Sequence, residues 1–268
     1  MSGSIKGAKG TGMLGAIAGD VFGASYEFRS FKEEDFDLFS LPRFFTDDTV
    51  LTIATAETLM GDGDYAAAYR RWGRRYPNRC YGGRFLDWLE DSSLGPYNSY
   101  GNGSAMRVSP IGWAFDSLTE VLEEAERSAS VSHNHPEGIK GAQATAGSIY
   151  LARMGASRME IRDEIVDRFG YDLNRTVEDI RPDYSFNETC QGSVPEALVA
   201  FLDANDFEHA LRLAISLDGD ADTQAAITGS VAEAFWGGVP ERIENEVREV
   251  LEKPLIDVLD RFTRRHRS

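Results

Sequence analysis

Adjacent carboxylates and hydroxyls precede an expected helix in the segment FFTDDTVLTIATAE, which contains Thr46, Asp47, Asp48 and Thr49. One such side chain would act as an N-cap, because a Thr or Asp oxygen accepts a hydrogen bond from an unpaired backbone N–H and the helix dipole favours negative charge. A cap needs only one of them. Two neighbouring carboxylates flanked by hydroxyls also form a hard-oxygen surface that suits a divalent cation. This segment alone leaves both interpretations open.

A second acidic segment, SLDGDADTQAAITG, places Asp218, Asp220 and Asp222 at alternating positions before Thr223. These carboxylates have no Lys or Arg between them and would repel one another unless an ion or solvent intervenes. A metal site is the hypothesis we favour, and a solvated acidic turn is the alternative. An EF-hand loop is excluded, because Thr223 and Gly229 occupy the positions that require Gly and Glu. A haloacid-dehalogenase-type phosphatase stays open, since LRLAISL could form its buried strand.

The segment YNSYGNGSAMRVSP is a glycine-rich junction before an apolar continuation; its candidate ligand-binding residues are Gly101, Asn102, Gly103, Ser104 and Met106. Glycines let a backbone approach a ligand closely, and consecutive N–H groups at a helix start can bind a phosphate without basic side chains. A plain turn would give the same pattern.

Two of the four histidines, His133 and His135, lie in SVSHNHPEGIKGAQA. A His-x-His pair can open a zinc site, but only His209 and His266 remain to complete one, and no β/α alternation supports a barrel. We therefore expect His133 to donate a hydrogen bond to a ligand and His135 to shape the turn before Pro136.

The segment GAIAGDVFGASYEF carries Glu27 at the end of an apolar stretch in which Gly15, Gly19 and Gly23 recur every four residues. That spacing gives one smooth helix face for close packing, with Glu27 either at the surface or beside a site. Two lysines precede the apolar stretch, as in a signal peptide, but Asp20 interrupts it and no clear cleavage pattern follows.

Most periodic stretches have apolar residues three and four positions apart, and alternating strand-like runs are scarce. Besides the helix after Thr46, the spacing predicts helices over Tyr65–Arg75, Ile139–Met154, Arg158–Phe169, Phe207–Ile215, Asp222–Trp236 and Arg242–Arg261. The sequence therefore predicts an all-α fold. We expect one domain over residues 13–268 after a flexible lead-in over residues 1–12.

Composition narrows the class of function. The 268 residues carry a formal charge of −16, which disfavours non-specific binding to nucleic acid. Cys80 and Cys190 are far apart, so neither a disulfide framework nor a Cys-rich zinc site is expected. No apolar run is long enough to span a membrane, and a cytoplasmic location is expected.

Taken together and in order, GDVFGASYE, TDDT, GNGSAMRVSP, SHNHPEGIKGA and DGDADT resemble the ADP-ribosylglycohydrolase family, over about Met13–Gly238. The resemblance implies an all-α fold with a central cleft that holds two divalent cations, Mg²⁺ or Mn²⁺. The metal ligands that it implies are Thr46, Asp47 and Asp48 from one side and Asp220, Asp222 and Thr223 from the other. Glu27 and Asp48 are the implied catalytic carboxylates, with Asp218 behind the ligands. The glycine junction and His133 correspond to diphosphate and ribose contacts.

The activity that this resemblance implies is hydrolysis of the glycosidic bond at the anomeric carbon of ADP-ribose, with an ADP-ribosylated protein or a small ADP-ribosyl compound as substrate. Arginine is the expected acceptor, and Tyr76–Trp88 and Arg181–Ser193 are candidate acceptor loops. We expect a monomer. A non-catalytic ADP-ribose-binding module is the main alternative, and the metal-dependent phosphatase is a weaker one.

Overall fold

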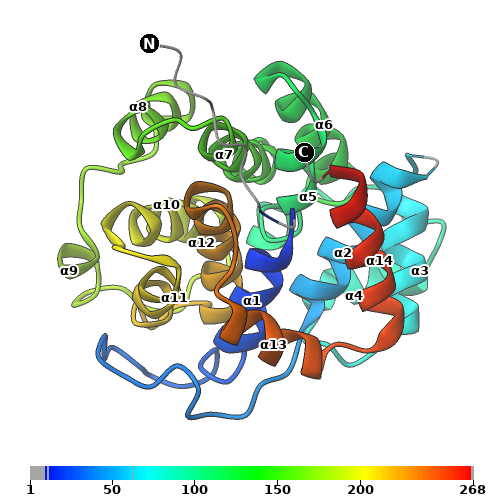
Figure 1. Cartoon of the computed structure of the whole chain (residues 1–268). Coiled ribbons are helices and arrows are strands. Elements are labelled where there is room, and N and C mark those ends of the chain that lie inside the picture. Colours follow the sequence, from blue (N-terminus) through cyan, green and yellow to red (C-terminus); the bar gives the residue numbers. More distant parts are fainter. Residues whose placement is uncertain (1–9, 11, 62, 267–268) are drawn as a thin grey trace.

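The structure, a computed structural model, describes residue 10 and residues 12–61 and 63–266. This part of the chain folds into α-helices that pack around a central pair (Figure 1), and its β-structure is one isolated antiparallel bridge between Gly101 and Thr189. The elements are α1 (Leu14–Gly23), α2 (Asp47–Met60), α3 (Tyr65–Arg75), α4 (Gly83–Glu90), η1 (Asn102–Ser104), α5 (Ser109–Ala114), α6 (Leu118–Ser130), α7 (Pro136–Arg153), α8 (Arg158–Phe169), α9 (Val177–Ile180), α10 (Cys190–Asp203), α11 (Phe207–Ile215), α12 (Ala221–Trp236), α13 (Glu241–Val250) and α14 (Lys253–His266). The predicted all-α fold is confirmed.

The central pair is α1 and α12, which lie against each other in opposite directions. Every residue of α1 is buried, and so is α12 up to its last turn. Gly23 faces Ala221 near the start of α12, whereas Gly15 faces Gly229 further along it. The backbones touch: a Cβ built on Gly19 would lie 2.0 Å from the carbonyl oxygen of Ala225. The predicted glycine face is thus a helix contact, and it brings the end of α1 beside the beginning of α12.

Side-chain caps fix where many helices start. Thr46 accepts a hydrogen bond from the backbone N–H of Asp48 at the start of α2, so the N-cap interpretation of that segment is also correct. Asp206 caps α11 in the same way. At the other end, α12 stops at Gly237, whose φ of 77° is left-handed and suits glycine.

Two sequence expectations need correction. The predicted helix over Arg242–Arg261 is two helices, α13 and α14, because the backbone turns extended at Leu251 and Pro254 fits only in the first turn of a new helix. The segment LRLAISL is not a strand: most of it belongs to α11. The phosphatase hypothesis therefore loses the buried strand on which it depends.

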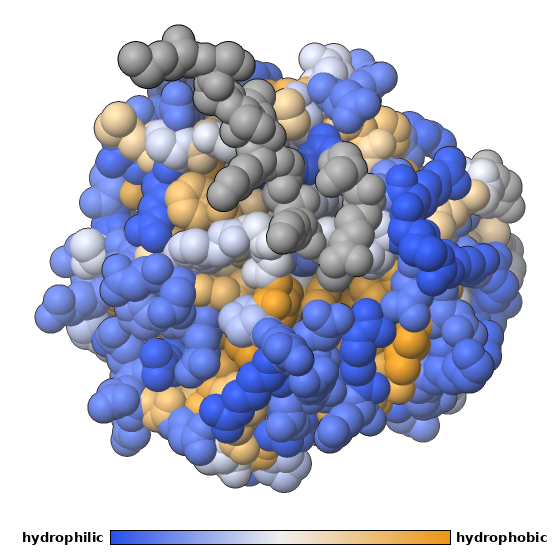
Figure 2. Space-filling view, in the orientation of Figure 1, coloured by the Kyte–Doolittle hydropathy of each residue, from blue (hydrophilic) through white to orange (hydrophobic). Residues whose placement is uncertain are grey.

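Most of the predicted lead-in, residues 1–12, lies outside the described residues. Of its two described members, Gly12 donates its N–H to Glu233 at 3.1 Å. Figure 2 shows hydrophilic residues over much of the visible face, with apolar residues between them. None of the helices in the described part of the chain has the length and apolar character needed to span a bilayer.

Candidate active site

The main candidate site is a cleft lined by segments from both halves of the chain. Its walls come from the loop after α1, the start of α2, the segment before and within α4, the junction around η1, the loop before α10, and the start of α12. The lining residues are Glu27, Asp47, Asp48, Leu51, Cys80, Gly82, Gly83, Arg84, Phe85, Tyr97, Ser99, Gly101, Asn102, Gly103, Met106, Arg107, His133, Phe186, Glu188, Asp220, Asp222 and Thr223.

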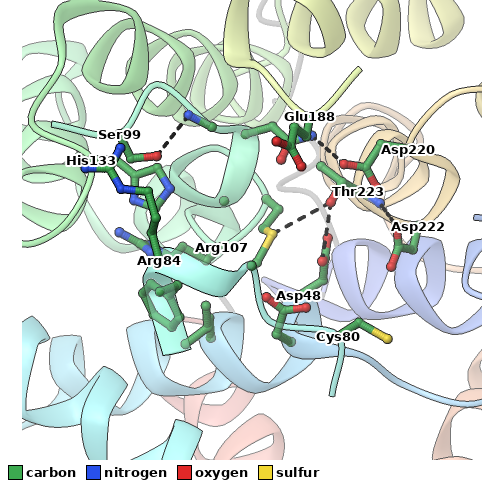
Figure 3. Close-up of a pocket in the computed structure, with 18 of the residues that line it drawn as sticks. Asp48, Cys80, Arg84, Ser99, Arg107, His133, Glu188, Asp220, Asp222 and Thr223 are labelled. Atoms are coloured by element: carbon green, nitrogen blue, oxygen red, sulfur yellow. Dashed lines mark hydrogen bonds between the residues drawn. The ribbon is translucent and has the colours of Figure 1, made fainter. Parts of the chain in front are cut away.

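The cleft has two chemically different sides. In Figure 3, Arg84, Ser99, Arg107 and His133 lie together on one side, and the aspartates at the start of α12 lie on the other. One side thus offers cationic and neutral hydrogen-bond donors, and the other offers carboxylates. This division suits a ligand with an anionic part and a part that binds through a metal.

Asp20 of α1 positions the acidic segment at the start of α2. Its buried carboxylate accepts hydrogen bonds from the backbone N–H groups of Thr46 and Thr49 and from both hydroxyls, including a 2.8 Å bond from Thr46 Oγ1. Asp20 lies in the segment GDVFGASYE, and the sequence by itself marks it only as an interruption of an apolar stretch. A lone acid within an otherwise apolar helix was the signal for this role, because burying a carboxylate requires several donors.

The starts of α2 and α12 meet in the cleft. Thr46 Oγ1 lies 3.2 Å from Asp222 Oδ2, and Thr223 Oγ1 lies 3.4 Å from Asp48 Oδ2. Both helices direct their positive dipole ends at the same carboxylates, which helps to keep negative charge there. The segments TDDT and DADT, far apart in the sequence, are therefore brought together as predicted.

Glu27 lies near the aspartates of α12. One carboxylate oxygen each from Glu27, Asp220 and Asp222 can be chosen so that all lie within 4.8 Å of one another. Asp47 lines the same cleft, and its backbone N–H donates a hydrogen bond to the carbonyl oxygen of Arg79 at 2.7 Å. The six predicted ligands and Glu27 thus converge on one region.

Burial and mutual repulsion raise the pKa values of these acids. Burial is the largest cause for each, and for Asp48 it is followed by the charges of other carboxylates, Asp222 first. The pKa values of Asp47 and Asp222 are raised well above the usual range for the same reasons. Burial raises the pKa of Glu27 to about 8 and that of Asp220 to about 6. The cluster would therefore hold protons or a cation in preference to bare charge.

The donor set fits a divalent cation. Asp48 Oδ1 is buried and has no hydrogen-bond partner, whereas buried carboxylate oxygens normally have one. The surrounding donors are carboxylate and hydroxyl oxygens, which Mg²⁺ and Mn²⁺ prefer. A cation would supply both the missing partner and the missing positive charge.

The glycine junction is tied to the loop before α10. Asn102 donates its N–H to the carbonyl of Glu188 at 2.8 Å, and Gly101 donates to Ser99 Oγ at 3.1 Å. Two of the N–H groups expected to bind phosphate therefore already have partners. Asn102 Nδ2 also donates to Asp220 Oδ2 at 2.8 Å, which connects the junction to the acidic side.

Some residues singled out in the sequence do not line the cleft. Thr46 and Ser104 are fully buried, and the hydroxyl of Ser104 donates to the carbonyl of Gly138 at 2.7 Å. Asp218 accepts hydrogen bonds from Ser30 Oγ and the N–H of Phe31, so it holds the loop that follows Glu27. His135 caps α7 by accepting from the N–H of Glu137, in keeping with the predicted turn. Met106 and His133 do line the cleft.

Several lining residues are not predicted one by one from the sequence. Cys80 and Arg84 lie in one proposed acceptor loop, and Phe186 and Glu188 lie in the other, so both loops contribute to the walls. Arg107 follows the glycine junction directly. Arg107 falls within the segment GNGSAMRVSP, whereas no motif marks the other four positions, which belong to the cleft only through the tertiary fold.

A model of the family described as ADP-ribosylglycohydrolase matches residues 7–267. The chain belongs to the ADP-ribosylglycohydrolase family. It is therefore a glycohydrolase whose class of substrate carries ADP-ribose, and the predicted family and enzyme class are confirmed. The non-catalytic binding module is accordingly set aside.

One curated relative is named for arginine as its acceptor, whereas the name of another gives no acceptor. The chain is 28% identical to ADP-ribosylarginine hydrolase Tri1 of Pseudomonas putida, over 94% of this chain and 80% of the relative. It is 24% identical to ADP-ribosylhydrolase ARH3 of Homo sapiens, over 85% of this chain and 86% of the relative. A solved structure titled "ADP-ribosylglycohydrolase-related protein complex" aligns with a TM-score of 0.71 and 28% identity, covering 94% of this chain and 97% of that one.

Proposed function

We propose that this glycohydrolase depends on two divalent cations and removes ADP-ribose from arginine by cleaving the bond at the ribose anomeric carbon. The observation that carries the metal dependence is the convergence of buried carboxylates around the unpartnered Oδ1 of Asp48. We assign Thr46, Asp47 and Asp48 of the α2 side and Asp220, Asp222 and Thr223 of the α12 side as ligands. Bound Mg²⁺ or Mn²⁺ would orient the ribose hydroxyls and lower the pKa of a bound water.

The substrate would lie across the two sides of the cleft. The diphosphate would lie against the donors, namely the lining residues Gly101–Gly103 of the junction and His133, and the ribose would lie beside the carboxylates. Asn102 connects the two subsites, because its backbone fixes the junction and its amide donates to Asp220. Met106, whose Sδ lies 3.7 Å from Thr223 Oγ1, forms an apolar part of the wall between the two subsites.

Glu27 is the residue to which we assign proton transfer. It is half-buried at the edge of the carboxylate cluster, and burial together with the charges of Asp222 and Asp20 raises its pKa to about 8. A carboxyl group with that pKa retains its proton near neutral pH in the metal-free protein, and its place at the edge of the cluster would let Glu27 deliver a proton to a leaving nitrogen. The other carboxylates, Asp48 among them, would stabilise positive charge that develops on the ribose.

Two features support arginine as the acceptor. ADP-ribosylarginine hydrolase Tri1 is similar to this chain over 94% of this chain and 80% of the relative. The loop residue Glu188 also lines the cleft and offers a carboxylate to a guanidinium group. ARH3 relatives carry no acceptor in their names, so serine is the comparison to test.

The deciding experiment measures ADP-ribose release from one protein modified on arginine and another modified on serine, with and without Mg²⁺ or Mn²⁺. We expect metal-dependent release from the arginine substrate, loss of release in the Asp47→Ala, Asp48→Ala double variant, and a large decrease in kcat for Glu27→Gln. Release that persists in a chelator would overturn the metal dependence. Release from serine alone would overturn the acceptor.

A further inference from the structure

Arg107 is a buried cation beside the donor side of the cleft. Its side chain is fully buried, and its guanidinium lies over the ring of Tyr69, 4.3 Å from the centroid. Nη2 donates to the carbonyl of Ser128 at 3.0 Å and to Ser132 Oγ at 3.1 Å, whereas Nε and Nη1 have no hydrogen-bond partner. Both acceptors are neutral, so no hydrogen-bonded carboxylate balances this charge.

Ser132 connects Arg107 to His133. Its hydroxyl oxygen lies 2.8 Å from His133 Nδ1. A guanidinium can only donate, so Ser132 Oγ accepts from Arg107, and its one hydrogen remains for another acceptor. Within the described chain, His133 Nδ1 is the acceptor in reach of that hydroxyl. If Nδ1 carried the hydrogen instead, a buried hydroxyl would have no acceptor, which is costly. Ser132 therefore donates to Nδ1, and the ring hydrogen belongs on Nε2.

Nε2 of His133 lies beside the glycine junction. A Cβ built on Gly103 would lie 3.2 Å from Nε2, and one on Gly101 would lie 3.6 Å away. Because Gly101 and Gly103 have no side chains, Nε2 lies close to the backbone to which we assign the diphosphate. Burial, and then the charges of Arg107 and Arg84, hold the pKa of His133 well below its usual range. The ring of Tyr97, 5.8 Å away between centroids, is a further neighbour and is uncharged at neutral pH.

We propose that Arg107 is a positioning residue that acts through Ser132 to hold His133 as a neutral imidazole with its hydrogen on Nε2, a fixed donor to the substrate diphosphate. The inference rests on the proposed function only for the identity of the ligand. Arg107 also places an unbalanced buried charge near that anion. Because the imidazole does not gain a proton near neutral pH, diphosphate binding through His133 stays constant as the pH changes.

Ligand-free protein gives the first test. Nitrogen-15 NMR of the four histidine rings, with His133 assigned by its loss in His133→Gln, reports which nitrogen carries the hydrogen. We expect a neutral His133 with the hydrogen on Nε2 from pH 5.5 to 8. A hydrogen on Nδ1 would overturn the proposal whatever the substrate is. Arg107→Met should raise the pKa of His133, whereas Arg107→Lys, which keeps the charge, should raise it less.

Ser132→Ala is the second test and avoids replacing a buried arginine. Ser128→Ala is the matched control: Ser128 is also fully buried one helical turn earlier, but its hydroxyl pairs with Tyr69. Calorimetry with ADP-ribose and Mg²⁺ should show about tenfold weaker binding for Ser132→Ala and less than a twofold change for Ser128→Ala. On the modified protein, KM should rise while kcat changes little.

These tests distinguish failure of the positioning role from failure of the proposed function. Equal affinities in Ser132→Ala and Ser128→Ala would overturn the positioning role even if the enzyme is a metal-dependent hydrolase. If wild-type protein failed to bind ADP-ribose, the ligand assignment and the proposed function would fail together, and the NMR result would still decide whether Arg107 and Ser132 set the state of His133.

Discussion

Asp48 shows that protein groups alone do not balance the negative charge of the cleft. Its Oδ1 is buried and unpartnered, and its pKa is raised by burial and by the nearby aspartates. A protein without metal must either hold a proton there or tolerate repulsion. Such unfavourable arrangements are typical of residues kept for function rather than for stability.

Asp48→Asn should therefore stabilise the metal-free protein while damaging the enzyme. Removing one buried charge should raise the free energy of unfolding by about 1 kcal/mol, which is roughly 2–4 °C for a chain of this size. Loss of a metal ligand should reduce kcat/KM by at least about 100-fold. Thermal unfolding in a chelator and steady-state kinetics with Mg²⁺ measure the two effects. Exposed Asp87 on α4 gives a control, Asp87→Asn, that should change neither. A lower melting temperature for Asp48→Asn would contradict this account.

At the scale of single residues, the sequence indicated which side chains gather in the cleft better than it indicated the residues that support them. Five of the six ligand candidates, Glu27 and Gly101–Gly103 line one cleft, and the sixth candidate, Thr46, lies 3.2 Å from Asp222. Their segments could be found because each carries its own signal of crowded acids or glycines. The roles of Asp20 and Arg107 were not predictable in this way. Their partners are backbone groups and hydroxyls from distant segments, and no local sequence pattern predicts such contacts.

Helix contacts decide whether the two ligand segments meet. The face of α1 that touches α12 has no room for side chains, because the carbonyl of Ala225 would lie 2.0 Å from a Cβ on Gly19. The two helices hold the acids at fixed places only at this short separation. The glycine spacing predicted a smooth face, but not which helix would cover it.

Gly19→Ala should separate α1 from α12 and destabilise the protein by about 3 kcal/mol or more, since backbone cannot yield as a flexible side chain can. Gly147→Ala in α7 is the matched control. A Cβ there would make ordinary contacts at 3.5 Å with Leu122, so this change should stabilise by up to about 1 kcal/mol through helix propensity. Chemical denaturation gives both values, and similar effects for the two variants would contradict the close packing.

Asp20 acts at the same scale, since it attaches the start of α2 to α1. Asp20→Ala removes an acceptor of four donor groups from Thr46 and Thr49 and should cost about 3 kcal/mol, with loss of metal-induced stabilisation. Asp206→Ala at the exposed start of α11 removes an ordinary cap and should cost about 1 kcal/mol without affecting metal binding. Differential scanning fluorimetry with and without Mg²⁺ separates the two. Equal costs would show that Asp20 is merely a cap.

Over the whole molecule, the fold class and about half of the helices followed from hydrophobic spacing, because long amphipathic segments have few other ways to bury their apolar faces. The break between α13 and α14 is not predictable in this way, since Val247, Leu251 and Leu255 continue a helical spacing across it. A monomeric state and a cytoplasmic location stay predictions.

The cleft should also set how stability varies with pH. Glu27 and Asp220 have pKa values raised to about 8 and about 6, so the folded metal-free protein holds protons that the unfolded chain releases. For acids with raised pKa values, this stability is present at low pH and lost as the pH rises through the folded-state pKa. Melting temperature in a chelator should therefore fall from pH 6 to 8.5.

Mg²⁺ competes with those protons, so its stabilising effect should grow over the same pH range. Fluorimetry in chelator and in Mg²⁺ at several pH values measures both trends. The Asp47→Ala, Asp48→Ala double variant should show a flatter pH dependence and little response to metal. A metal-free melting temperature that rose between pH 6 and 8.5 would contradict the raised pKa values.

The packing of α1 on α12 also determines when activity can appear during protein synthesis. The N–H of Gly15 donates to Glu233, 218 positions later, and the ligand segment at the start of α2 depends on a second segment that is synthesised long after it. Until α12 emerges, α1 has no partner for its glycine face and the nascent chain has only half of a cleft. A ribosome-bound chain stalled before residue 220 should therefore be inert, because Asp220, Asp222 and Thr223 have not yet been added.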